Sequence, residues 1–345
     1  MTGNTLGWVI VAFVLYLLMM IAIGAFYAKG NNNSEDYFLG GRKLNGFVAA
    51  LSAQASDMSG WLLMGLPGAI YLTGVGGDGW IAIGLFIGTT LNWLFIATKL
   101  RRYTIRANNS VTLPTYFENR FHDEKKVLMT VSSITIVVFF LVYCASALSA
   151  GGQLFESVFG IDYHVALTIG ALVVLVYTFL GGFTAVCVTD FIQGMLMLVG
   201  ILAVPLFAYH FLTTGGTTLS AGLEASGADS ANFLNLMKNG DGSNNIVSVI
   251  SGLGWGLGYF GMPHILVRFM AVRDEKEMTK SKATAISWVA LSLGFAVFIG
   301  ILGRAYLPEL VNGNNEKVFI EMIKKVFTVE MRAPFIAGLF LCGIL

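Results

Sequence analysis

Long apolar runs recur along the whole sequence, and they limit the kinds of fold that it can adopt. Each run is about 20 residues long, which is the length that an α-helix needs to cross a bilayer. Of the 345 residues, 56% are hydrophobic and 12% are charged, whereas soluble domains carry about 25% charged residues. The pattern predicts an all-α protein that crosses the membrane many times, and it excludes a soluble enzyme.

We expect eight complete membrane spans and the start of a ninth. The complete spans are predicted at residues 6–27, 47–72, 80–98, 127–151, 165–180, 186–212, 246–271 and 283–307, and the ninth begins at Ala333. A surface helix is expected at residues 113–121, with polar or charged loops at 30–46, 213–245, 273–282 and 308–332. Because the chain ends inside an apolar run at Leu345, we expect a fragment of a longer protein, truncated in the ninth span.

The distribution of Lys and Arg among the loops predicts the orientation of these spans. If the N-terminus is outside, the inner loops hold fifteen of the 21 basic residues, including Arg268, and the outer loops hold six. Cytoplasmic loops usually carry this excess, so we expect the N-terminus outside. The net charge of +1 gives no basic footprint for nucleic acid. No phosphate loop or nucleophile triad is present, so we expect neither an enzyme nor an ATP-driven pump.

An acidic residue interrupts the second span. Asp57 lies among Ser56, Ser59 and Gly60, with Pro67 further along the run. A charged residue at membrane depth costs about 2.5–3.5 kcal/mol and is usually functional, while Ser, Gly and Pro weaken the helix. We expect an unwound turn beside a cavity, where carbonyl, hydroxyl and carboxylate oxygens suit an alkali cation. A kinked helix that hydrogen-bonds Asp57 for packing is the alternative.

The seventh span is interrupted in a different way. Five glycines occur between residues 252 and 261, and Pro263 follows. Trp255, Tyr259 and Met262 recur at helical spacing on one face. The glycines could serve close helix packing, or they could open the backbone to a small zwitterion with an apolar body. Two interrupted spans at corresponding positions predict an inverted-repeat secondary transporter.

Four segments closely resemble the bacterial sodium/proline symporters of the sodium:solute symporter family. They are SDMSGWLLMGLPGA at residues 56–69, LGGRKLNG at 39–46, LVYCAS at 141–146 and GWGLGYFGMPHILVRFMA at 254–271. The resemblance covers nearly the whole chain and implies a leucine-transporter-type fold. Residues 1–345 would then form one transporter domain, with an extra N-terminal span at 6–27, a first five-span repeat at 47–212 and the start of an inverted second repeat at 246–345.

The resemblance also implies a function and a site. It implies Na⁺-coupled uptake of L-proline by alternating access, in a multi-pass protein of the bacterial inner membrane, with no obligatory protein partner. Matching positions would place Na⁺ at Asp57 and at the carbonyls of Ala55 and Met58, with the remaining ligands beyond Leu345. The expected solute-binding residues are Ser59, Gly60, Tyr143, Trp255, Tyr259 and Pro263, and Arg42 and Asp190 match positions used in coupling or gating.

Other interpretations stay open at this point. The chain could be the membrane input module of a sensor kinase, or a symporter for another small solute, and the ion could be Li⁺ or H⁺. Taken singly, Asp190 could cap a helix start, Arg42 could be only a positive-inside anchor, and Tyr143 could be a packing residue.

Overall fold

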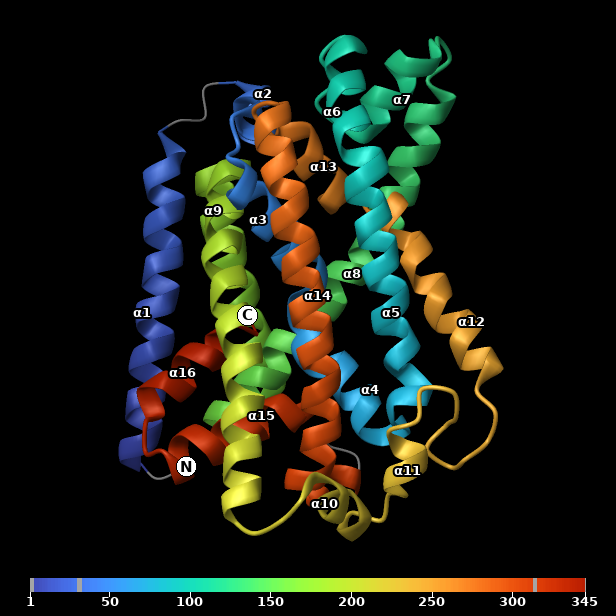
Figure 1. Ribbon diagram of the computed structural model, residues 1–345. Coiled ribbons are helices and arrows are strands. Elements are labelled where there is room, and N and C mark those ends of the chain that lie inside the picture. Colours follow the sequence, from blue (N-terminus) through green and yellow to red (C-terminus); the bar gives the residue numbers. More distant parts are fainter. Residues whose placement is uncertain (1–2, 30–32, 313–314, 345) are drawn as a thin grey trace.

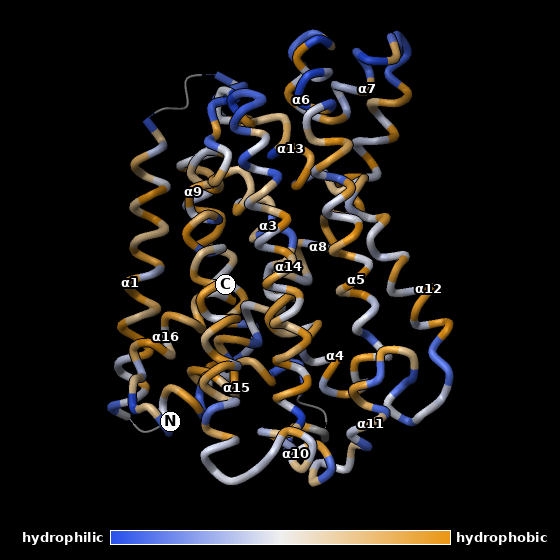
Figure 2. The backbone as a smooth tube through the Cα atoms, in the orientation of Figure 1, coloured by the Kyte–Doolittle hydropathy of each residue, from blue (hydrophilic) through white to orange (hydrophobic). Residues whose placement is uncertain are grey.

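The computed structural model describes residues 3–29, 33–312 and 315–344, and helices dominate throughout these ranges. The described part of the chain contains no β-strand beyond two isolated bridges. Most helices run between two ends of an elongated bundle (Figure 1). We call the end at which the chain begins the N-terminal side, and the opposite end, which carries most of the loop Lys and Arg, the basic side. Polar residues gather at both ends, and apolar residues fill the middle (Figure 2).

Several helices are long and apolar enough to cross a membrane. Five pass by length and composition: α1 (Gly3–Ala28), the continuous rod Val75–Arg106, α8 (Val127–Phe159), α9 (Tyr163–Thr214) and α14 (Glu275–Tyr306). A sixth is counted when the bent pair Ile246–Phe260 and Pro263–Ala271 is taken as one span. The rod contains α5 (Val75–Leu91), the π-helical turn η3 (Asn92–Ile96) and α6 (Ala97–Arg106). The chain is therefore a multi-pass membrane protein.

The helix α9 is a hairpin of two arms. Gly182 interrupts it with φ 61° and ψ −162°, a backbone conformation that favours glycine. Tyr177 and Gln193, on either side of this break, line one cavity of about 70 Å³ beside α1. In a straight helix these residues would lie about 24 Å apart, so the chain folds back at Gly182. The two arms correspond to the spans expected at residues 165–180 and 186–212.

The loops between the spans are partly ordered as short helices. The expected surface helix is confirmed as α7 (Leu113–Phe121), which follows the N-cap Thr112. The loop expected at 30–46 contains α2 (Ser34–Leu39) and η1 (Gly40–Arg42), and the loop at 213–245 contains α10 (Leu219–Ala225) and α11 (Ser230–Phe233). The segment after α14 contains η5 (Pro308–Asn312), η6 (Asn315–Lys317), α15 (Val318–Ile323) and η7 (Lys324–Glu330). Residues 30–32, 313–314 and Leu345 lie outside the described residues.

The expectation of a charged loop at residues 273–282 is wrong, because α14 already begins at Glu275. Asp274 caps this helix by accepting a hydrogen bond from the Glu277 amide at 2.9 Å. That amide bond and the neighbouring Arg273 hold the pKa of Asp274 below its ordinary value. The acids in the first turn also suit the positive end of the helix dipole. The charged stretch is therefore a helix start rather than a loop.

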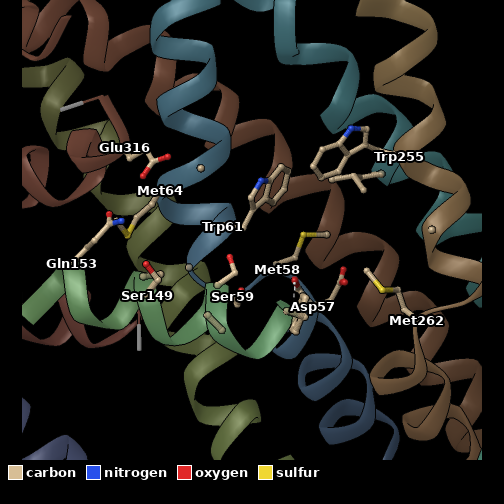
Figure 3. A pocket seen from close by; sticks show the side chains of 18 of the residues that line it. Asp57, Met58, Ser59, Trp61, Met64, Ser149, Gln153, Trp255, Met262 and Glu316 are labelled. Carbon is tan, nitrogen blue, oxygen red and sulfur yellow. Dashed lines mark hydrogen bonds between the residues drawn. The ribbon is translucent and has the colours of Figure 1, made fainter. Parts of the chain in front are cut away.

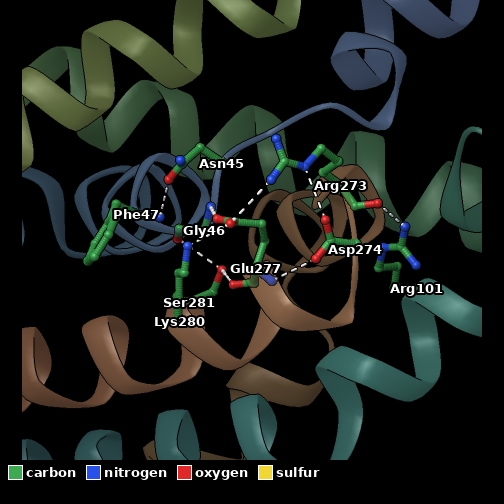
Figure 4. Close-up of polar contacts among 9 residues, drawn as sticks. All are labelled: Asn45, Gly46, Phe47, Arg101, Arg273, Asp274, Glu277, Lys280 and Ser281. Atoms are coloured by element: carbon green, nitrogen blue, oxygen red, sulfur yellow. Dashed lines mark hydrogen bonds and ion pairs between the residues drawn. The ribbon is translucent and has the colours of Figure 1, made fainter.

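Glu277 joins the start of α14 to the start of α3 (Gly46–Gly60) (Figure 4). Its carboxylate accepts a hydrogen bond from the Gly46 amide at 2.8 Å and lies 2.8 Å from Lys280 and 3.3 Å from Arg273. The Ser281 hydroxyl donates to the Gly46 carbonyl at 2.9 Å. A Cβ atom at Gly46 would lie only 2.3 Å from the Glu277 carbonyl oxygen, so this contact requires glycine. These contacts fix α3 and α14 together on the basic side.

Candidate functional site

The first broken span consists of α3, the π-helical turn η2 (Trp61–Gly65) and α4 (Leu66–Thr73). The break lies at Ser59, which has φ 40° and ψ −150°. A non-glycine residue in this region is strained, so the surrounding contacts must hold it there. The expected interruption of this span is confirmed, and it falls two residues after Asp57.

The second broken span runs in the opposite direction (Figure 1). It consists of α12 (Ile246–Gly254), the 3₁₀ turn η4 (Trp255–Phe260) and α13 (Pro263–Ala271), with a bend of 43° between Phe260 and Pro263. Pro263 is the first residue of α13, where its missing amide costs nothing. A Cβ atom at Gly256 would lie 2.2 Å from the Gly84 carbonyl oxygen. Part of the glycine run therefore serves close packing against α5.

A cavity of about 540 Å³ lies where the two broken spans meet α8 (Figure 3). Its wall includes backbone from both breaks, several aromatic rings and the polar face of α8. The charged residues in the wall are Asp57 and Glu316, and no Lys or Arg occurs among the described residues that line it. The remaining lining residues are Met58, Ser59, Gly60, Trp61, Met64, Gly65, Leu85, Tyr143, Ser146, Ala147, Ser149, Ala150, Gln153, Trp255, Gly258, Tyr259 and Met262.

Asp57 is the more buried of the two acids that line this cavity. Its side chain is 5% exposed, and Oδ1 lies 3.4 Å from Nε2 of His264. Oδ2 is buried without a hydrogen-bond partner in the described part of the chain. A buried carboxylate oxygen without a partner is costly, and an alkali cation would satisfy it. The residues present therefore fit a Na⁺ ion.

Tyr143 connects α8 to the broken end of α3. Its hydroxyl lies 2.6 Å from the Ser56 carbonyl oxygen and 3.1 Å from the Asp57 carbonyl oxygen, and can donate to either. Its ring stacks on His264 of α13, with centroids 5.2 Å apart and an interplanar angle of 26°. Tyr143 is therefore a pocket residue that also holds the unwound turn, rather than a packing residue alone.

Two indoles stack on each other in the wall of the cavity. Trp61 of η2 and Trp255 of η4 stack with ring centroids 5.7 Å apart and an interplanar angle of 24°. Trp255 is 49% exposed, whereas Tyr259, one turn later, is 3% exposed. The Tyr259 hydroxyl lies 3.9 Å from the sulfur of Met58. The two broken spans thus contribute an aromatic wall on one side of the cavity.

Asp190 occupies a different environment on the second arm of α9. Its Oδ2 accepts hydrogen bonds from Ser52 at 2.7 Å, from Ser56 at 2.9 Å and from Arg268 at 2.9 Å. Arg268 also donates to the His264 carbonyl at 2.8 Å. Asp190 is thus not a helix cap. The expectation that Arg268 lies in an inner loop is wrong, because Arg268 is buried on α13, where Asp190 neutralises its charge.

Arg42 also lies inside the molecule, at 8% exposure. It donates to the carbonyls of Met270 and Ser110, both at 2.8 Å, and to the Asn109 side chain at 3.0 Å. Burial lowers the pKa of its guanidinium from the ordinary value. Arg42 therefore joins η1 to the end of α13 and to the α6–α7 connection, which is more than a surface anchor does.

The structure brings together most of the residues predicted for the site. Those that line the cavity are Asp57, Met58, Ser59, Gly60, Tyr143, Trp255 and Tyr259. Ala55 is buried outside the lining, near Gly194 of α9. Pro263 starts α13 behind the cavity and does not line it. The helix α16 (Pro334–Cys342) approaches the break from the other side, and the Ile344 carbonyl oxygen lies 3.6 Å from where a Gly60 Cβ would be.

Some lining residues were not among those predicted from the sequence. Ser146, Ser149 and Gln153 follow Tyr143 at spacings that keep them on one face of α8, so this polar face was detectable in the sequence. Trp61 lies within a quoted motif and was detectable too. Glu316 comes from η6, more than 250 residues after Asp57, and no local pattern indicates that it reaches the cavity.

The fold and this site define a class of membrane transporter. The family model described as the Sodium:solute symporter family matches residues 37–345, and the chain belongs to this family. The description of this family is one of solute symporters and names no enzyme.

Named relatives are found within the family. The chain is 44% identical over 342 residues to a sodium/proline symporter of Salmonella typhimurium and 44% identical over 342 residues to that of Escherichia coli, with 97% of this chain and 65% of each relative covered. It is 41% identical over 338 residues to a sodium/proline symporter of Staphylococcus aureus, covering 97% of this chain and 63% of the relative. The chain thus spans less than two thirds of the length of each of these relatives.

A solved structure has the same fold. A Na⁺-coupled sialic acid symporter in a substrate-bound outward-open state matches with a TM-score of 0.78 and 20% identity, over 98% of this chain and 71% of that one. The expected fold class is confirmed: an all-α polytopic membrane protein of the leucine-transporter type.

Proposed function

We propose that this chain forms the ion- and solute-binding part of a secondary transporter that couples L-proline uptake to Na⁺ entry. The observation that carries the proposal is the cavity between two antiparallel broken spans, lined by Asp57, whose buried Oδ2 has no hydrogen-bond partner among the described residues. The names of relatives at 41–44% identity support proline and sodium as the solute and the ion.

The ion would bind at the break in the first span. Asp57 would supply a carboxylate oxygen, and Ala55 and Met58 would supply carbonyl oxygens. Hard oxygen ligands suit Na⁺, and an unwound helix exposes them without a further conformational cost. Tyr143 already lies on the neighbouring carbonyls of Ser56 and Asp57, so ion binding and the shape of the solute pocket would be linked through this side chain.

The solute would bind beside the ion, between the two broken spans and α8. Trp255 and Tyr259 would contact the apolar ring of proline, and Ser59 and Gly60 would lie between the ion and the solute. The absence of Lys and Arg from the described lining leaves the bound Na⁺ and free backbone amides to meet the proline carboxylate. Pro263 would act indirectly, by fixing where α13 begins.

Na⁺ coupling can supply enough energy for accumulation. A membrane potential of about 100 mV supplies roughly 2.3 kcal/mol per charge, and a tenfold Na⁺ gradient adds roughly 1.4 kcal/mol. One Na⁺ per proline would then sustain accumulation of a few hundredfold. Arg42 and Asp190 would take part in gating, since each joins helices from different parts of the chain on the basic side of the cavity.

The orientation and the repeats belong to the same proposal. We infer that the basic side faces the cytoplasm of a bacterial cell and that the N-terminus is outside. Residues 6–27 would be the extra span, 47–212 the first repeat and 246–345 the start of the inverted second repeat. The opposite directions of the two broken spans support this division (Figure 1).

Labelled L-proline uptake into proteoliposomes tests the proposal, using the protein that carries this chain. We expect uptake to require an inward Na⁺ gradient and to collapse with a Na⁺ ionophore. Proline binding without accumulation would favour a sensory input module instead. No response to proline would leave the fold unchanged and would contradict the assigned solute.

A further inference from the structure

An exposed lane of side chains runs along the outer face of the rod Val75–Arg106. The α6 lane consists of four apolar side chains followed by three cations: Ile87, Leu91, Leu94, Phe95, Lys99, Arg102 and Arg106. The apolar members are 38–57% exposed, and all three cations are exposed. Figure 2 shows the change from apolar α5 to polar α6 along this rod.

The π-helical turn η3 lies at the change from apolar to basic side chains. Its closing hydrogen bond joins the Ala97 amide to the Asn92 carbonyl, five residues back, so one extra residue is inserted. Asn92 and Trp93 face inward, where Trp93 packs on Phe269 with ring centroids 4.4 Å apart. Leu94 and Phe95 are left on the outer face, at 47% and 57% exposure.

A fourth cation reaches the same place from α14. The Lys282 ammonium lies 3.4 Å from the Leu94 carbonyl oxygen within η3. Arg102, one turn after Lys99, pairs with Glu275 of α14 at 2.7 Å, and both of those side chains are at least half exposed. Among the described residues, neither Lys99 nor Arg106 has a carboxylate within salt-bridge distance. In the part of the chain that the structure describes, Glu275 is therefore the one carboxylate within salt-bridge distance of these four cations, so their positive charge is only partly balanced.

We propose that the α6 lane binds an anionic phospholipid on the basic side of the membrane. The acyl chains would lie along Ile87, Leu91 and Phe95, and the headgroup phosphate would lie among Lys99, Arg102 and Lys282. An exposed apolar face within a membrane span is covered by lipid, and basic side chains at its end attract anionic headgroups. The charge and length of the lane match a phospholipid rather than a soluble anion.

Lipid retention by the purified protein tests this site without any transport measurement. Phosphatidylglycerol and phosphatidylcholine with the same acyl chains would be titrated onto the protein in detergent, and bound lipid counted by native mass spectrometry. We expect a preference for phosphatidylglycerol of at least roughly tenfold. Inorganic phosphate at the same concentration should not displace the bound phosphatidylglycerol. Displacement by phosphate would show that the site binds soluble anions, and it would overturn the proposal.

The matched variants carry the same loss of charge. K99Q/R102Q/K282Q should lose most of the preference, whereas R120Q/K125Q/K126Q, on the same side of the membrane, should keep it. Equal losses in both variants, or none in the first, would overturn the proposal. If the triple variant does not fold, the single change K99E at an exposed position should still lower the preference by about threefold. No Na⁺ or proline is present, so the outcome is independent of the proposed symport.

Discussion

Two buried aspartates, Asp57 on α3 and Asp190 on α9, have different surroundings. Asp190 of α9 reaches α3 through Ser52 and Ser56, and Arg268 neutralises it. Asp57 of α3 points to the cavity, and within the described residues its Oδ2 has no hydrogen-bond partner. A carboxylate oxygen whose hydrogen bonds are all made to neighbouring side chains holds helices together. A carboxylate oxygen without such partners is available to a mobile cation. Burial alone therefore does not identify the ion site; the partners do.

The largest effect is expected from Arg268→Gln. The substitution leaves Asp190 as an uncompensated buried charge, which costs about 3–5 kcal/mol. We expect a lower melting temperature and loss of the monodisperse peak in size-exclusion chromatography. Arg106→Gln is the matched control, because Arg106 is exposed and has no ion pair among the described residues. Equal stability of the two variants would contradict the structural role assigned to the Asp190–Arg268 pair.

Asp57→Asn should have the next largest effect, on ion affinity rather than on stability. Loss of a carboxylate beside the cation should lower the affinity for Na⁺ by about 100-fold, given the strength of a partly buried charge pair. The measurement is proline binding as a function of Na⁺ concentration. Asp241→Asn, in an exposed loop, is the control. Near-normal Na⁺ dependence in Asp57→Asn would exclude this residue from the ion site.

Trp255→Ala should act mainly on the solute. Removing an aromatic anchor from a binding pocket costs about 2 kcal/mol, which corresponds to roughly 30-fold in affinity. Proline affinity at saturating Na⁺ should fall by this amount, while Na⁺ affinity changes little. Trp8→Ala is closely matched in exposure, at 51% against 49%, and should have no effect. An unchanged proline affinity would show that η4 does not form part of the proline pocket.

Tyr143→Phe should give the smallest effect. The change keeps the ring stacked on His264 and removes the hydroxyl that lies on the Ser56 and Asp57 carbonyls. Loss of one hydrogen bond is worth about 1 kcal/mol, or about fivefold. Both Na⁺ and proline affinity should fall together, since the hydroxyl links the two sites; Tyr209→Phe, on an exposed face, serves as the control. A loss confined to proline would contradict that link.

Local sequence features predicted the parts of the fold that depend on local chemistry. Ser59 and Gly60 beside Asp57 indicated the first break, and the glycine run with Pro263 indicated the second. The start of α14 was misassigned because charge was taken as a sign of a loop, although Asp274 is a helix cap.

Contacts between distant segments were not predictable in this way. The pairing of Arg268 with Asp190 joins residues 78 positions apart, and Glu316 reaches the cavity from a segment beyond α14. Periodicity shows which face of a helix is apolar, but it does not show which helix lies opposite. Several site residues, among them Tyr143, were assigned from the family resemblance rather than from physical reasoning about the chain.

The most direct test of Na⁺-coupled symport through this cavity is to measure the charge that moves with proline. Proteoliposomes containing the protein that carries this chain would be adsorbed on a solid-supported membrane and exposed to L-proline, with Na⁺ or K⁺ as the only alkali cation. Na⁺-coupled symport predicts an inward positive current in Na⁺ that disappears in K⁺ and in the Asp57→Asn variant. A proline-dependent current of equal size in K⁺, or proline uptake with no charge movement, would contradict Na⁺-coupled symport through this cavity.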